Sequence, residues 1–160
     1  MSRIIVDGLS LLEGAQTIQG TNIVLVGGCF DVIHFGHVCF LRAAKKSGDV
    51  VVVALENDEF IRTSKKREPF HTHIQRAEML SELQTVDTVL MLPSMKGAED
   101  YRALVQRIRP TVIAVTTGDK QLSNKRLFAD SVGAQLIEVC EPIAGLSSST
   151  LLHYDHLLYD

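Results

Sequence analysis

The sequence predicts an α/β fold, a three-layer sandwich built around a parallel sheet of five strands. Five short apolar runs rich in β-branched residues recur along the 160-residue chain, and segments of helical periodicity separate them. Continuous apolar runs are typical of strands buried on both faces, and regular alternation of strands with helices favours a parallel sheet. The predicted strands cover residues 23–26, 50–55, 86–92, 111–115 and 135–139.

Helices are predicted between these strands. Val38, Leu41 and Ala44 recur at helical spacing after the first strand, and residues 101–108 show the same period before the fourth. Residues 1–22 contain a weakly amphipathic stretch, for which we expect a leading helix packed on the sheet edge. Glycine and proline residues agree with the predicted helix ends, at Gly48, Pro110 and Gly133.

Composition and charge restrict the class of protein. The chain is 46% hydrophobic and 22% charged, which predicts one soluble globular domain over residues 1–160. Its net charge of −3 gives no overall attraction to nucleic acid or to an anionic membrane, so neither is expected as a partner. No apolar run reaches the roughly 20 residues of a membrane span, and the first residues do not have the pattern of a signal peptide.

The three cysteines, Cys29, Cys39 and Cys140, are an odd number without a C-x-x-C pair. Such a set predicts neither a disulfide framework nor a zinc ribbon. Free thiols are typical of a reducing compartment, so we expect a cytoplasmic protein.

The end of the first strand carries the strongest functional signal. A glycine pair at residues 27–28 allows close approach of a phosphate to the backbone, and the helix that includes Val38 would offer free N–H groups to the same anion. His34 and His37, spaced i, i+3 across Gly36, would project from one face of the first helical turn as hydrogen-bond donors. The pattern therefore predicts a phosphate site.

Two alternatives remain for this stretch. Gly28 could make a tight turn, with the histidines satisfying only polar groups of the loop. The other alternative is a two-histidine metal site, with Asp31 and Cys29 as the nearest further ligands. Because open α/β sheets bind ligands where the strand order reverses, the site is expected beside the first and fourth strands.

Residues 28–37, Gly-Cys-Phe-Asp-Val-Ile-His-Phe-Gly-His, resemble the nucleotidylyltransferases that carry an H-x-G-H signature after a G-x-F-D loop. Within the cytidylyltransferase-like branch, the stretch is similar to the adenylyltransferases that make ADP-heptose and to glycerol-3-phosphate cytidylyltransferase. The likeness covers nearly the whole chain and implies a Rossmann-like fold, with catalysis by His34 and His37. Asp31 has two further alternatives, a role in loop shape or one linked to a metal. The nucleotide contacts that the resemblance implies in this stretch are Gly28, Cys29, Phe30, Asp31 and Gly36.

A basic run, Arg-Thr-Ser-Lys-Lys-Arg, lies at residues 62–67 after the second strand. The resemblance implies a mobile loop here whose lysine, Lys65 or Lys66, closes over the triphosphate during catalysis. A solvated charged loop is the alternative. Arg76 matches an arginine that the cytidylyltransferases use for the phosphate of the second substrate, and a surface arginine on a helix is its alternative.

Two later stretches resemble further family elements. Gly118 and Asp119 follow the fourth strand, and the resemblance implies that they lie near the nucleotide; Asp119 could accept from a sugar hydroxyl or simply make a turn. Residues 144–152 predict a helix start capped by a serine, whose hydroxyl and N–H groups would also bind phosphates. The residues implied here are Gly145, Leu146, Ser147 and Ser149 for the nucleotide and Ser148 for catalysis.

The resemblance implies transfer of a nucleoside monophosphate from a nucleoside triphosphate to a small phosphorylated acceptor, a sugar or polyol phosphate, with release of pyrophosphate. We expect an adenylyltransferase of the heptose-phosphate type, because Pro142 and Gln84 stand where cytidylyltransferases have arginines. A cytidylyltransferase and a nucleotide-binding module without turnover are the alternatives. Mg²⁺ would arrive with the triphosphate rather than occupy a protein cage, and we expect a homodimer.

Overall fold

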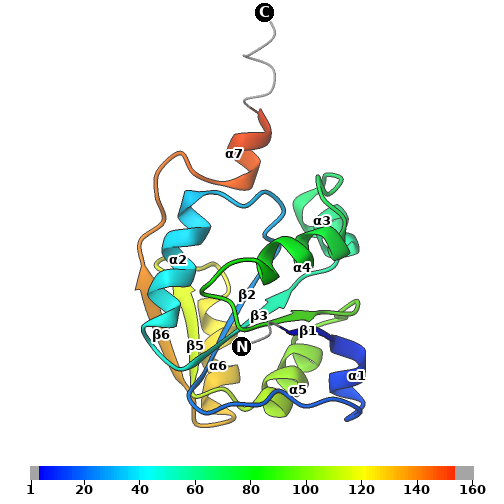
Figure 1. Cartoon of the computed structure of the whole chain (residues 1–160), viewed down its shortest axis with the longest axis vertical. Helices are drawn as coiled ribbons and strands as arrows, with labels where there is room; N and C mark the ends of the chain where they lie inside the picture. The colour runs from blue at the N-terminus through cyan, green and yellow to red at the C-terminus, as the bar shows by residue number, and fades with distance from the viewer. Residues whose placement is uncertain (1–3, 154–160) are drawn as a thin grey trace, which may run out of the picture.

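The computed structural model describes residues 4–153, and a parallel sheet of six strands in the order β1-β4-β3-β2-β5-β6 forms its centre (Figure 1). None of the helices within residues 4–153 is both long and apolar enough to cross a membrane. The strands are β1 (Ile4–Asp7), β2 (Ile23–Gly28), β3 (Val50–Leu55), β4 (Thr88–Met91), β5 (Val112–Thr116) and β6 (Gln135–Cys140). The helices are α1 (Gly8–Leu12), α2 (Phe35–Lys45), α3 (Asp58–Lys65), α4 (His73–Ser81), α5 (Ala98–Ile108), α6 (Leu122–Asp130) and α7 (Ser148–His153).

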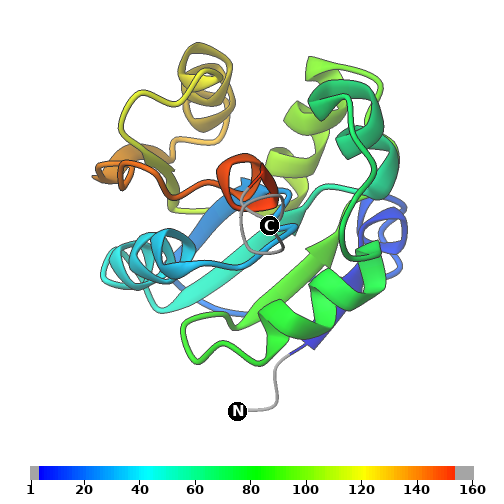
Figure 2. The ribbon, with the colours of Figure 1, turned by 90° about the horizontal axis from the view of Figure 1, so that it is seen from above.

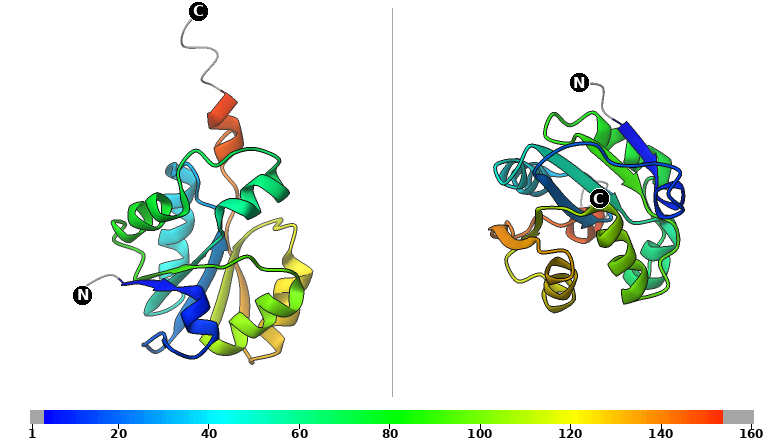
Figure 3. Two further views of the ribbon diagram at one scale, coloured as in Figure 1. Left: turned by 90° about the vertical axis from the view of Figure 1, so that its right-hand side faces the viewer. Right: turned by 90° about the horizontal axis from the view of Figure 1, so that it is seen from below.

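Two helical layers cover the sheet, so the three-layer α/β sandwich is confirmed (Figure 3). Helices α2 and α4 cover one face, where Leu41 and Leu80 belong to the same buried cluster as Val24. Helices α1, α5 and α6 cover the other face, where Leu104 shares a cluster with Leu25. Because successive residues of β2 serve opposite cores, this strand reads in the sequence as a continuous apolar run.

The predicted leading helix is present over residues 8–12, as α1, but a strand that was not predicted precedes it. Residues 4–7 form the edge strand β1, which pairs with β4 from Ile4 opposite Thr88 onward. The Asp7 carboxylate then accepts a hydrogen bond from the Ser10 N–H at 3.0 Å and starts the short helix α1. The β-branched residues before Asp7 favour strand pairing, so the sheet has six strands rather than five. The first three residues of the predicted leader lie outside the part of the chain that the structure describes.

The basic run differs from the mobile loop that the resemblance implied, because most of it lies on helix α3. The helix is capped by Asn57, whose side-chain oxygen accepts from the Phe60 N–H at 2.9 Å. Asp58 and Glu59 place acidic side chains in its first turn, where they complement the helix dipole. The helix ends at Lys66, which has a left-handed φ of 57°.

The strand order reverses beside β2. From β2 the chain passes to β3 and then β4 on one side, and later returns to β5 on the other side of β2. The carboxyl ends of β2 and β5 therefore lie next to each other at the start of α2. This is the position expected for a ligand site in an open α/β sheet, and it agrees with the location predicted from the sequence.

Leu11 tests whether the leading segment belongs to the core. Its side chain is 1% exposed in the cluster shared with α5, whereas Leu9 on the same helix is 50% exposed. Leu11→Ala is expected to lower the free energy of unfolding by about 2–5 kcal/mol, because it removes buried methyl groups and leaves a cavity. Leu9→Ala, measured by the same urea denaturation, should change it by less than about 0.5 kcal/mol. Equal effects of the two substitutions would contradict the packing of α1.

Candidate active site

A cavity of about 270 Å³, here called the crevice, opens at the carboxyl ends of β2 and β5. Its walls come from the β2–α2 stretch, the ends of β5 and β6, helix α6 and the segment around the start of α7. The predicted site residues that line it are Gly28, Cys29, Phe30, His34, Gly36, His37, Asp119, Leu146, Ser147 and Ser148. The predicted residues outside its lining are Asp31, Lys65, Lys66, Arg76, Gly118, Gly145 and Ser149.

His34 and His37 lie at the start of α2 with their rings stacked, 3.8 Å apart between centroids. His37 also packs against Phe30, with 4.9 Å between ring centroids. The backbone N–H of His34 donates to Nδ1 of His37 at 3.4 Å, so a neutral His37 carries its proton on Nε2. Nδ1 of His34 is buried and has no hydrogen-bond partner among the described residues. His34 Nδ1 therefore keeps unused hydrogen-bonding capacity beside the crevice.

Both imidazoles are neutral at pH 7. Burial lowers the pKa of His34, and burial together with the charge of His34 lowers the pKa of His37 to about 4. A neutral imidazole still donates one N–H to a phosphoryl oxygen. The negative charge of a bound phosphate would draw both pKa values upward, since it favours the protonated rings.

Neighbouring rings leave no space for a Cβ atom at two glycines, Gly28 and Gly36. A Cβ atom at Gly28 would lie 2.9 Å from Cε2 of Phe30, and one at Gly36 would lie 2.9 Å from Cε1 of His34. Phe30 itself has a left-handed φ of 45°, which its buried ring holds in place. These glycines allow the rings to approach the backbone, and their contact with a phosphate stays a prediction.

Asp31 fixes the connection between α3 and α4. Its buried carboxylate accepts from the backbone N–H groups of Phe70 and His71, each at 3.0 Å, and pairs with Arg67. Burial acts to raise the pKa of Asp31, but these hydrogen bonds and the Arg67 charge hold it below its ordinary value. This geometry favours the alternative in which Asp31 shapes the loop.

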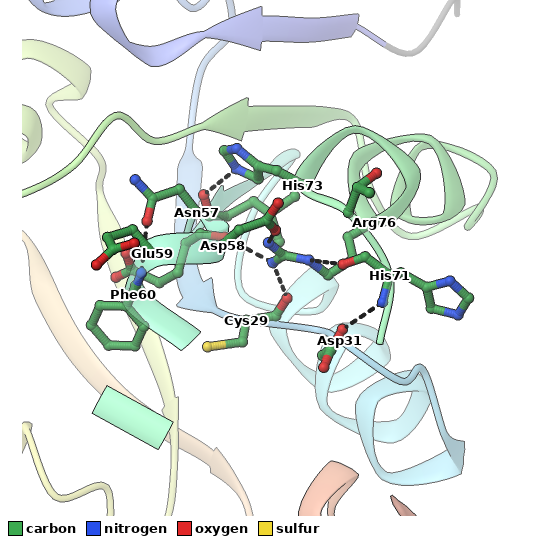
Figure 4. Close-up of polar contacts among 12 residues, drawn as sticks. Cys29, Asp31, Asn57, Asp58, Glu59, Phe60, His71, His73 and Arg76 are labelled. Carbon is green, nitrogen blue, oxygen red and sulfur yellow. Dashed lines mark hydrogen bonds and ion pairs between the residues drawn. The ribbon is translucent and has the colours of Figure 1, made fainter. Parts of the chain in front are cut away.

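Arg76 on α4 is fully buried (Figure 4). Its guanidinium donates to the carbonyl oxygens of Cys29 and Glu56 at 2.7 Å and of His71 at 3.1 Å. The Asp58 carboxylate completes the set with an ion pair of 2.7 Å. The side chain therefore ties the ends of β2 and β3 to the loop before α4. This placement favours a positioning role over the predicted contact with an acceptor phosphate.

The basic run contributes no side chain to the crevice wall. Arg62 and Arg67 are engaged in ion pairs with carboxylates, and Lys65 and Lys66 are exposed. Burial raises the pKa of the Cys29 thiol, and the charge of Lys65 acts against this rise. Lys65 thus acts electrostatically on a residue of the crevice, and a contact between either lysine and a triphosphate stays a prediction.

A polar cluster beside the crevice escaped the sequence analysis. Lys125 on α6 lines the crevice and pairs with Asp119 at 2.7 Å. The Asp119 carboxylate also accepts from the Gln121 N–H at 2.7 Å, so Asp119 does make a turn. Burial raises the pKa of Glu56, while its 2.7 Å hydrogen bond from the Tyr101 hydroxyl and the charge of Lys125 act to lower it. Because Lys125 lies six residues after Asp119, the spacing of helical ion pairs did not reveal the pair.

The segment before α7 joins the last helix to the H-x-G-H stretch. The Ser147 hydroxyl accepts from the Thr150 N–H at 3.0 Å and caps α7, as the sequence predicted. The Ser148 hydroxyl donates to the Val32 carbonyl at 3.3 Å. Helix α7 consequently lies above the carboxyl ends of the central strands (Figure 2). Two stretches more than 100 residues apart in the sequence thereby share one wall of the crevice.

The side chains of the described residues do not provide a metal site. Among residues 4–153, no group of three or more His, Cys, Asp or Glu side chains could hold a metal ion. The carboxylates of Asp31 and Asp119 are both paired with cations. The described residues therefore do not form a cage for Mg²⁺, and Mg²⁺ as a counter-ion of bound triphosphate stays a prediction.

Arg76→Met tests the positioning role of the buried guanidinium. We expect it to lower the free energy of unfolding by about 3–5 kcal/mol, because Asp58 and the buried carbonyls lose their partner. Arg62→Met, which breaks an exposed ion pair, should leave the midpoint of the same urea denaturation close to that of the parent. An Arg76→Met protein as stable as the parent would contradict the positioning role.

The histidine pair predicts a pH dependence of stability. The folded-state pKa of His37, about 4, lies below its ordinary value of 6.5, so the unfolded chain binds more protons between these two values. Above pH 6.5 the ring is neutral in both states, and His37 does not reduce the free energy of unfolding. As the pH falls from 6.5 toward 4, protonation of the unfolded chain lowers this free energy. An NMR titration of the His37 ring should follow the low pKa, and a midpoint at or above 6.5 would contradict its burial beside His34.

Comparison with known proteins identifies the family. The profile of the Cytidylyltransferase-like family matches residues 25–149. FAD synthase of Thermococcus kodakarensis is 40% identical over 121 residues, which cover 72% of this chain and 78% of that protein. The bifunctional protein HldE of Geobacter sulfurreducens is 30% identical over 149 residues, which cover 91% of this chain but only 29% of that protein.

A solved structure has the same fold. The crystal structure of the lipopolysaccharide core biosynthesis protein from Thermoplasma volcanium superposes with a TM-score of 0.62 at 23% identity. The match covers 78% of this chain and 98% of that one, and it shows a shared fold. From the family profile and the aligned relatives together, the chain belongs to the cytidylyltransferase-like family of nucleotidyltransferases.

Proposed function

We propose that this nucleotidyltransferase is an adenylyltransferase, which transfers AMP from ATP to the phosphate of a small acceptor and releases pyrophosphate. The observation that carries the proposal is the crevice at the strand reversal, where the stacked His34 and His37 lie at the N-terminal, positive end of α2. Such donors suit a reaction in which negative charge builds on phosphoryl oxygens.

The reaction needs alignment more than covalent chemistry. A phosphate oxygen of the acceptor forms the new bond to the α-phosphorus, and the bond from that phosphorus to the oxygen bridging to the β-phosphate breaks. The electron pair leaves with pyrophosphate. His34 and His37 donate hydrogen bonds to the phosphoryl oxygens, and Ser147 and Ser148 on the same wall add hydroxyl groups. Mg²⁺ bound to the triphosphate would neutralise part of its charge.

Two observations favour ATP over CTP. FAD contains an adenylyl group, and relatives named FAD synthase align over most of their length. Pro142 and Ile143, which have no hydrogen-bonding side chain, line the crevice where the resembling cytidylyltransferases carry an arginine at the first of these positions. An apolar wall suits a base held by stacking and by backbone groups.

The acceptor has two candidate chemistries, each favoured by a different observation. A heptose phosphate or related sugar phosphate is favoured by the resemblance of residues 28–37 and by the alignment with HldE over nearly the whole chain. Flavin mononucleotide is favoured by the higher identity to FAD synthases. Both acceptors carry the phosphate monoester that the reaction requires.

Pyrophosphate release decides between these possibilities. The purified full chain would be assayed with ATP or CTP against flavin mononucleotide, heptose phosphates and glycerol 3-phosphate, all with Mg²⁺. We expect release with ATP and one phosphorylated acceptor. Release with CTP alone would support the cytidylyltransferase alternative. Nucleotide binding without release for any acceptor would support the binding-module alternative and contradict the proposal.

His37→Ala tests the histidine pair. We expect turnover to fall by about 10²–10³-fold, the usual effect of removing one donor from a site where charge develops. Phe35→Ala, an exposed side chain in the same first turn of α2, is the matched control and should leave turnover unchanged. Circular dichroism would monitor the fold of both variants. Turnover of His37→Ala close to that of the parent would show that the imidazole serves only packing.

A further inference from the structure

Lys125 is the only lysine or arginine among the described residues that line the crevice. It projects from α6, on the side of the sheet opposite α2, and its side chain is 26% exposed. Neither the sequence analysis nor the resemblance pointed to it. A substrate with a triphosphate or a phosphate monoester therefore meets one fixed cation in this wall.

The other candidate cations are occupied elsewhere or lie outside the crevice. The Arg76 guanidinium is buried and bonded to three carbonyls and a carboxylate. Arg67 pairs with Asp31, and the exposed Lys65 and Lys66 do not line the crevice. None of these groups can take the place of Lys125 in the wall without a rearrangement of the loops.

Asp119 positions the Lys125 ammonium, and Glu56 adds a second negative charge nearby. Asp119, which follows β5, accepts one hydrogen bond from Nζ at 2.7 Å and is itself held by the Gln121 N–H. Glu56, which follows β3, interacts electrostatically with Lys125, and its carboxylate accepts a hydrogen bond from the Tyr101 hydroxyl at 2.7 Å. An ammonium group has three donors, so donors remain for a substrate after the bond to Asp119 is made.

Charge balance in the crevice supports a binding role for this lysine. Asp119 and Glu141 are the carboxylate residues of the lining, and Lys125 is the cation that offsets them. Without it, a polyanionic substrate would face carboxylates across a partly buried space, where like charges repel more strongly than in water. Placing a cation there costs desolvation, which the pairing with Asp119 offsets.

We propose that Lys125 binds a phosphate group of the substrates, with Asp119 as the residue that positions its ammonium. The inference rests on the proposed nucleotidyl transfer and adds a residue to it. The phosphate belongs either to the nucleoside triphosphate or to the acceptor. The two sources share the same chemistry, a phosphoryl oxygen accepting from Nζ, and separate measurements of nucleotide and acceptor distinguish them.

The test compares Lys125→Met, Lys125→Arg and Lys120→Met. Lys120 is an exposed lysine of the loop that precedes α6 and does not line the crevice, so its variant is the matched control. ATP affinity is measured by calorimetry without acceptor, and KM is measured for each substrate with the other saturating. Urea denaturation verifies folding, and Lys125→Gln replaces Lys125→Met in all assays if the latter does not fold.

We expect Lys125→Met to weaken the binding of one substrate by about tenfold or more, the usual loss for a charge-assisted hydrogen bond. Lys120→Met should bind both substrates as the parent does. Lys125→Arg should recover most of the loss, because it keeps the charge. A weaker ATP affinity assigns the contact to the triphosphate, and a raised acceptor KM with unchanged ATP affinity assigns it to the acceptor phosphate. ATP affinity and both KM values within twofold of the parent would overturn the inference.

Failure of the proposed function has a different signature. If the parent protein binds ATP but releases no pyrophosphate with any acceptor, the enzyme proposal fails, and calorimetry still tests Lys125. In that case reduced ATP affinity of Lys125→Met supports the inference. ATP affinity equal to that of the parent overturns it.

Discussion

The buried guanidinium of Arg76 is the interaction on which the geometry of the site depends. It joins the carbonyls of Cys29, Glu56 and His71 with the Asp58 carboxylate, so the ends of two strands and the loop before α4 meet at one side chain. The H-x-G-H stretch begins five residues after Cys29, at His34. The rings at the start of α2 therefore hold their place relative to β3 and α3 through a single charged group that water does not reach.

This arrangement explains how a chain of net charge −3 can bind phosphorylated substrates. Several of its cations are used internally: Arg76 and Arg67 hold loops, and Arg62 pairs with neighbouring carboxylates. The crevice itself is lined by neutral donors, by the carboxylate residues Asp119 and Glu141, and by one lysine, Lys125. The lowered pKa values of His34 and His37 agree with this description. Two neutral imidazoles can donate hydrogen bonds to phosphate, and they do not repel each other before a phosphate binds.

Much of the fold could be predicted because strands buried on both faces leave continuous β-branched runs, as β2 and β3 do. The short edge strand β1 was missed because four residues, of which the last is the capping Asp7, give too little periodicity to separate from a helix. A cavity lies where the glycine pair and the two histidines predicted a phosphate site, and phosphate binding there stays a prediction. The role of Arg76 could not be predicted from the sequence, because burial of an arginine leaves no local pattern. Lys125 was missed because its ion pair with Asp119 does not have helical spacing.

A crystal structure with a non-hydrolysable ATP analogue tests the account most directly, because the central claim is that the crevice between β2 and β5 holds the reacting phosphates. We predict the α-phosphate within hydrogen-bond distance of His34 or His37, with the base against the wall that contains Pro142. A triphosphate bound along α3 alone, or at the amino ends of the strands beside Arg109, would contradict it.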